Sequence, residues 1–190
     1  MQRADHDLAF MLQYENIAWY EDGKVKILDR RIYPARVEFV TCGTHQEVAQ
    51  AITDMVTQSA GPYTAVPMGM ALAAHECRDK TAAEQMEYLR KAAHTISHAR
   101  PTTVKRMALL CDLCLAEAER ALAAGEDTAQ AIVNKTVELN NTRYERVAKI
   151  GKYLVDLFPE NGTVMTHCFA ETIVGMMLRE CSERGKHIRL

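Results

Sequence analysis

The segment Gly162-Thr163-Val164-Met165-Thr166-His167-Cys168 passes directly into a helix-like run. Its residues Thr163–His167 have the composition of a β-strand, so Cys168 is expected at the mouth of the following helix. A helix N-terminus carries partial positive charge and free N–H groups, and both favour thiolate over thiol. The chain ends at Leu190, where a second parallel strand should begin, so the segment predicts the first β–α unit of a parallel sheet.

The composition is that of a globular protein without a strongly charged partner. Hydrophobic residues make up 48% of the 190 residues and charged residues 25%, which is enough apolar material for a core. The formal charge of -2 argues against a nucleic-acid partner, and no apolar run is long enough for a membrane partner. Six cysteines without a secretory signal lead us to expect a cytoplasmic protein with free thiols.

The first part of the chain alternates like a small antiparallel sheet. Ile17–Tyr20 and Lys24–Asp29 flank the dipeptide Asp22-Gly23, which is a strong hairpin signal. Val37–Val40 alternates again and predicts a third short strand. We therefore assign residues 1–43 to an N-terminal β element.

Helical periodicity dominates residues 44–160 and predicts a helical domain. Thr44 and Thr81 are each followed by a glutamate at the spacing of a capping box, so each is expected to begin a helix. Gly61-Pro62 is expected to end the first of these helices. The polar run Asn140–Arg143 is interpreted as a junction between two later helices.

Two patterns invite a metal or redox interpretation, and the core interpretation is favoured for the first. Cys111 and Cys114 have CxxC spacing but lie inside a helix beside leucines, whereas a redox motif opens a helix and a zinc ribbon needs a second ligand pair. His94 and His98 share a helix face without an acidic third ligand at a clear spacing. We therefore expect no metal and no redox cofactor.

Several segments, taken in order, carry a resemblance to a known family. They are the hairpin Ile17–Pro34, the helix Glu47–Val56, the small-residue helix Met68–Ala74, the Arg-Pro-Thr segment Ala99–Val104 and the cysteine segment Thr166–Cys168. With these motifs the chain resembles the methylthioribose-1-phosphate isomerase family. That family also includes ribose-1,5-bisphosphate isomerases and the regulatory subunits of translation initiation factor 2B.

The resemblance implies a helical N-terminal domain followed by a Rossmann-like domain, of which residues 161–190 form the start. We therefore expect a mostly α protein with a small N-terminal antiparallel β hairpin. Its helical domain would be followed by the first β–α unit of a truncated Rossmann-like domain. The partner implied is a second copy of the chain, or a second polypeptide that completes the Rossmann-like half, because the predicted strand leaves an unpaired edge.

The resemblance also implies an aldose–ketose isomerase that acts on a pentose 1-phosphate. Cys168 would take part in moving a proton between adjacent sugar carbons. Arg100 and Thr102, at a helix start, would bind the substrate phosphate. Backbone N–H groups at Ser59 and Gly61 would assist them. The family's second catalytic group, an aspartate, would lie beyond the last residue of this chain.

Each of these sites has a simpler structural alternative when the residues are taken alone. Cys168 could be a buried core cysteine, Arg100 a solvated residue at a helix start, and Gly61-Pro62 only a turn. Two departures from the isomerase pattern also leave a second function open. The loop Gln58–Pro62 contains no arginine, and Phe169 stands where the family usually has asparagine. The alternative is a non-catalytic regulatory or assembly module, similar to the initiation factor 2B subunits.

Overall fold

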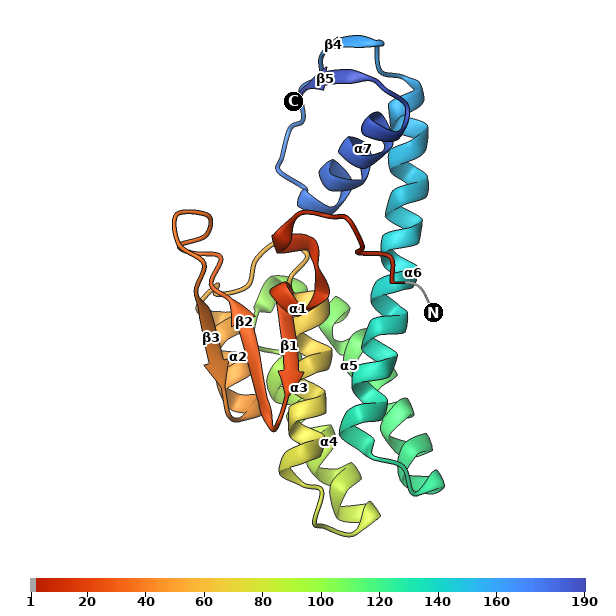
Figure 1. The fold of residues 1–190 in the computed structure, drawn as a ribbon. Helices are drawn as coiled ribbons and strands as arrows, with labels where there is room; N and C mark the ends of the chain where they lie inside the picture. The colour runs from red at the N-terminus through yellow and green to blue at the C-terminus, as the bar shows by residue number, and fades with distance from the viewer. Residues whose placement is uncertain (1–2) are drawn as a thin grey trace.

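A computed structural model describes residues 3–190 and shows an elongated molecule. A small sheet lies beside a bundle of helices, and the long helix α6 extends from that bundle to a C-terminal α/β unit at the other end (Figure 1). The chain is therefore mostly helical, with a β element near each terminus. This confirms the expected fold class.

The N-terminal sheet has the strand order β1-β2-β3 with antiparallel pairing throughout. The chain first forms a 3₁₀ turn and the short helix α1, Tyr14–Ile17. The three strands follow as β1 Ala18–Glu21, β2 Lys24–Leu28 and β3 Phe39–Cys42. Asp22 and Gly23 both have positive φ, 49° and 71°, as the tight turn of a hairpin requires. The predicted hairpin is confirmed, and the third strand begins slightly later in the chain than expected.

Helices form the rest of the N-terminal part. They are α2 His45–Thr53, α3 Pro62–Glu76, α4 Ala82–Ser97, α5 Val104–Ala124 and α6 Thr128–Asp156. The Thr81 side chain accepts from the N–H of Glu84, whose carboxylate accepts from the N–H of Thr81, so this capping box is confirmed. Thr44 caps α2 through the N–H of Glu47 as expected.

The centre of the core is α3, which packs against α2, α4, α5, α6 and the sheet. Its side chains are apolar on all faces, and that pattern is typical of a helix surrounded by protein. Met68, Met70 and Leu72 are fully buried. A side chain at Gly69 would meet Val48 of α2 within 2.8 Å, so glycine allows the close approach of α2 and α3.

Two sequence-based predictions about helix boundaries are wrong. Gly61-Pro62 does not end α2, which already ends at Thr53, and instead Pro62 opens α3 at the position where proline is favoured. Asn140–Arg143 is not a junction, because α6 runs unbroken through it. Asn140 is buried and its amide donates to the Thr64 hydroxyl of α3 at 3.2 Å. Tertiary hydrogen bonds thus hold a polar run in the helix.

The C-terminal unit consists of β4 Asn161–Thr163, α7 Glu171–Glu183 and β5 His187–Arg189. The two strands pair in parallel, so the unit is a complete βαβ motif. This corrects two expectations. The strand predicted over Thr163–His167 ends at Thr163, and the second parallel strand lies within the chain, ahead of Leu190. The domain boundaries at 43/44 and 160/161 stay predictions.

Candidate functional site at the starts of three helices

The loops that contain the predicted phosphate-binding residues lie at one end of the bundle. The Tyr63 ring, in the first turn of α3, lies 5.2 Å from Cζ of Arg106, in the first turn of α5. The Thr53 hydroxyl at the end of α2 donates to the carbonyl of Ala99 at 2.9 Å. The starts of α3 and α5 therefore lie together, at the end of the bundle that faces the C-terminal unit (Figure 1).

The loop before α3 is tightly constrained around Gly61. A Cβ at Gly61 would come within 2.0 Å of Oγ1 of Thr57, so a larger residue would displace the loop. The N–H of Gly61 already donates to the carbonyl of Gln58 at 2.8 Å. Ser59 is exposed and has a left-handed φ of 55°. The backbone N–H of Ser59, rather than that of Gly61, is thus the one left for a ligand.

The Arg-Pro-Thr segment forms a 3₁₀ turn, Pro101–Thr103, rather than the first turn of an α-helix. Thr102 is exposed and Arg100 is half-buried. The carbonyl of Arg100 accepts from the N–H and the hydroxyl of Thr103, at 3.1 Å and 3.3 Å. Within residues 3–190 the Arg100 guanidinium makes no hydrogen bond or ion pair, so it is available to an anion.

Cys168 lies in the irregular segment that precedes α7. The helix begins at Glu171, so Cys168 stands ahead of the helix mouth rather than in its first turn. Its carbonyl accepts from the N–H of Ala170 at 2.9 Å. The thiol is exposed, whereas the five other cysteines are buried. The alternative interpretation of Cys168 as a buried core cysteine is therefore wrong.

Arg30 ties the start of α7 to the loop before α3. Its backbone N–H donates to the carbonyl of Val56 at 2.8 Å, and its Nη1 lies 3.4 Å from Oε1 of the buried Glu171. The segment with Cys168 is thus anchored at the same end of the bundle as Ser59. No hydrogen bond or ion pair within residues 3–190 joins Cys168 to Arg100, so the fold brings together the segments and not these two side chains.

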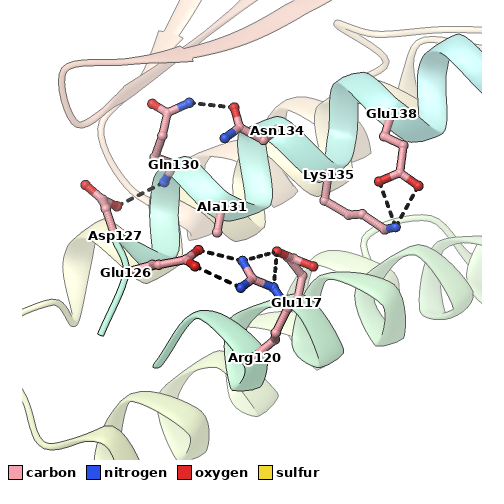
Figure 2. A pocket seen from close by; sticks show the side chains of 9 residues that line it. All are labelled: Glu117, Arg120, Glu126, Asp127, Gln130, Ala131, Asn134, Lys135 and Glu138. Carbon is pink, nitrogen blue, oxygen red and sulfur yellow. Dashed lines mark hydrogen bonds and ion pairs between the residues drawn. The ribbon is translucent and has the colours of Figure 1, made fainter. Parts of the chain in front are cut away.

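A polar groove of about 290 Å³ lies away from this end, between the last turns of α5 and the first half of α6 (Figure 2). Its charges already have partners within the groove. Arg120 pairs with Glu117 at 2.7 Å and with Glu126 at 2.6 Å, and Lys135 lies 2.9 Å from Glu138. The groove is therefore a solvated network of ion pairs that offers no free cation to a ligand.

The CxxC pair is part of the core, as the sequence indicated. Cys111 and Cys114 are buried, and burial raises the pKa of Cys111 to about 12 and that of Cys114 further. His94 and His98 stack on each other with ring centroids 4.1 Å apart. Within residues 3–190 no group of three or more metal-ligating side chains forms, and no helix is long and apolar enough to cross a membrane.

Comparison with known proteins identifies the family. The model of the initiation factor 2 subunit family matches residues 61–190. This chain belongs to the initiation factor 2 subunit family. The resemblance expected from the sequence is thereby confirmed. The matched region includes the start of α3, the Arg-Pro-Thr segment and Cys168 of this family member.

Curated relatives of this family member are isomerases of about twice its length. A putative methylthioribose-1-phosphate isomerase of Archaeoglobus fulgidus is 28% identical over 186 residues, which cover 90% of this chain and 52% of the relative. The methylthioribose-1-phosphate isomerase of Carboxydothermus hydrogenoformans is 31% identical over 156 residues, or 80% of this chain and 44% of the relative. The chain thus spans about half the length of these relatives.

Solved structures share the fold of this family member. Subunit delta of the translation initiation factor eIF-2B from A. fulgidus aligns with a TM-score of 0.68 and 24% identity, over 92% of this chain and 53% of that one. The 5-methylthioribose 1-phosphate isomerase of Pyrococcus horikoshii aligns with a TM-score of 0.62 and 22% identity, over 90% and 50%. At these identities the comparison establishes the fold alone.

Proposed function

We propose that this chain is the N-terminal part of a sugar-phosphate aldose–ketose isomerase. The observation that carries the proposal is the meeting of three segments at one end of the bundle, one with an exposed thiol and one with an unpaired guanidinium. The curated relatives that are named as methylthioribose-1-phosphate isomerases support the reaction class. The substrate would be a pentose 1-phosphate, and the protein would be cytoplasmic, without metal, redox cofactor, nucleic acid or membrane partner.

Each proposed site residue has a distinct role in this function. Arg100, Thr102 and the backbone N–H of Ser59 would hold the phosphate, since guanidinium and backbone N–H groups are its usual ligands, and Gly61 would keep the loop in the tight conformation that presents Ser59. Cys168 would exchange the proton of a sugar C–H group. A second group must manage the neighbouring oxygen, and we propose that a complementing polypeptide supplies it as an aspartate.

A second candidate function is a regulatory or assembly module that binds the sugar phosphate without converting it. Two observations favour it. Ser59 stands in the loop where the isomerases carry an arginine, and Phe169, next to the thiol, is 61% exposed. Such a module would keep phosphate binding and lose proton transfer.

An apolar stripe on α6 supports a partner in either case. Ile150 and Tyr153 on the C-terminal half of α6 and its C-cap residue Leu157 follow one another at helical spacing and are 48%, 61% and 81% exposed. We propose that a second copy, or the polypeptide that completes the Rossmann-like half, covers this stripe.

Thiol labelling combined with a turnover assay tests the proposed function. Iodoacetamide should modify Cys168 faster than Cys111, because Cys168 is exposed while burial raises the pKa of the Cys111 thiol to about 12. A pentose 1-phosphate should slow the labelling of Cys168 in the wild type but not in Arg100→Ala. Peptide mass spectrometry gives both rates.

The outcomes separate the two functions. Turnover that disappears in Cys168→Ser while substrate binding is kept identifies the isomerase. Protection of Cys168 without turnover identifies the regulatory module. Labelling of Cys168 as slow as that of Cys111, with no protection, rejects both.

A further inference from the structure

A cluster of guanidinium and aromatic groups lies at the start of α3, outside the residues assigned above. Cζ of Arg106 and Cζ of Arg143 lie 5.2 Å and 5.3 Å from the centre of the Tyr63 ring. Tyr63 belongs to the first turn of α3, Arg106 to the first turn of α5 and Arg143 to the middle of α6. Three helices thus bring two cations to one aromatic ring.

The charge of this cluster lacks a counter-charge. Nε and Nη2 of Arg143 are buried and have no hydrogen-bond partner among the residues that the structure describes. None of the ion pairs formed within residues 3–190 includes Arg106 or Arg143. Arg143 as a whole is half-buried, but a stacked ring compensates only part of the cost of removing its two buried nitrogens from water, so these nitrogens indicate that an anion belongs beside them.

Glu171, the first residue of α7, is a second buried polar group that is incompletely paired within residues 3–190. It is 5% exposed, its Oε1 lies 3.4 Å from Nη1 of Arg30, and its Oε2 has no hydrogen-bond partner in the described part of the chain. Glu171 and Arg143 do not form an ion pair with each other. Buried polar atoms without partners are rare in folded proteins and are concentrated where a ligand completes the network.

We propose that Arg106 and Arg143 form an anion subsite that binds a phosphate group at the N-terminus of α3. The Tyr63 ring lies against both guanidinium groups, the Tyr144 ring lies 4.7 Å from Cζ of Arg143, and the partial positive charge at the start of α3 adds to theirs. The subsite lies just beyond Ser59, so α5 and α6 supply the positive charge that the loop lacks. That the phosphate belongs to a sugar rests on the proposed function.

The experiment measures inorganic phosphate binding to the whole chain by isothermal titration calorimetry. Arg106→Gln and Arg143→Gln should each weaken phosphate binding about tenfold or more, since each removes a charge-assisted contact. Arg146→Gln is the matched control, because Arg146 is exposed on the same helix and should leave the affinity unchanged. Equal affinity in all variants, or no phosphate binding by the wild type, overturns the subsite.

Further measurements separate a loss of phosphate binding from a loss of folding. If Arg143→Gln does not fold by circular dichroism, the exposed Arg106→Gln decides alone. If Arg143 serves only to balance Glu171, then Arg143→Gln and Glu171→Gln lower the melting temperature equally with and without phosphate, and the subsite is rejected. Repeating the titration with ribose 5-phosphate distinguishes a sugar-borne phosphate from the free ion. Loss of phosphate binding in the variants supports the subsite even when no turnover is found.

Discussion

At the scale of single residues, the half-buried Glu76 joins the three helices α2, α3 and α4. Its carboxylate accepts from the backbone N–H of His45 at 2.7 Å, lies 2.5 Å from Nδ1 of His45, and accepts from the Tyr88 hydroxyl at 2.8 Å. Burial opposes the ionisation of Glu76, but these hydrogen bonds outweigh it and hold its pKa below the ordinary value. Burial and the same carboxylate raise the pKa of Tyr88 to about 12.

The lowered pKa of Glu76 leads us to expect that the stability of the fold depends on pH. A lowered pKa in the folded state stabilises the fold above the unfolded-state pKa, and that contribution is lost as the pH falls through the folded-state value. Glu76→Gln should therefore lower the free energy of unfolding by about 1–3 kcal/mol at pH 7. The difference from the wild type should shrink below about pH 4.3, the ordinary range of a glutamate.

Urea unfolding at several pH values measures this difference. Glu87→Gln is the control, since Glu87 is exposed on α4 and its one ion pair within residues 3–190 is with the exposed Lys91. A difference between Glu76→Gln and the wild type that stays constant down to pH 3 would show that the carboxylate is not the group that titrates.

At the scale of elements, Asn140 explains why α6 is continuous. Its amide and the Thr64 hydroxyl are both buried and pair with each other at 3.2 Å, between residues 76 positions apart. Asparagine favours turns because its side chain competes for backbone groups, and here the tertiary partner removes that competition. The helix therefore passes through a run that its local sequence would break.

A double-mutant cycle tests this link between α3 and α6. Asn140→Leu and Thr64→Val should each cost about 1–3 kcal/mol of unfolding free energy, because each leaves the other polar group buried and unsatisfied. The double variant should lose less unfolding free energy than the sum of the two single losses, because neither polar group is then left buried without a partner. Asn134→Ala, exposed on the same helix, is the control. Strictly additive costs in urea unfolding would contradict the pairing.

Local signals in the sequence predict the elements whose stabilising contacts are local. The hairpin at Asp22-Gly23 and the caps at Thr44 and Thr81 depend on neighbours within one turn, so they are predicted correctly. The continuity of α6 depends on a distant partner. The strand predicted to His167 ends at Thr163, since β5 pairs with Asn161–Thr163 and its last contact is the Arg189 carbonyl, which accepts from the N–H of Val164 at 2.9 Å.

The candidate site likewise has residues that the sequence indicates and residues that only the three-dimensional structure reveals. Arg100 and Ser59 are candidates because their segments resemble a family, and Cys168 is a candidate because of its expected place ahead of a helix and the same resemblance. Only the fold shows that these segments lie at one end of the bundle. The cluster around Tyr63 has no sequence signal, because Arg106 and Arg143 reach the ring from different helices. Only the packing of α3, α5 and α6 makes it visible.

At the scale of the whole molecule, the C-terminal unit is a small α/β body held on a long helix. Its sheet contains only β4 and β5, and every residue of β4 is exposed. Parallel sheets are normally covered on both faces. Met165, which follows β4, is 93% exposed, and the exposed apolar residues Ile150, Tyr153 and Leu157 belong to the long helix and the C-cap that lead into the same C-terminal unit. This distribution is typical of a surface that another polypeptide covers.

The last prediction is that the chain is not a monomer at micromolar concentration. Light scattering after size exclusion should report a dimer or a complex with a second polypeptide. Leu157→Glu should shift it toward the monomer, because Leu157 is 81% exposed and a buried charge would oppose association. Lys152→Glu, an exposed position on the same helix, should change the mass far less. A monodisperse wild-type monomer would contradict the partner, and equal masses for wild type and Leu157→Glu would place the interface elsewhere on the molecule.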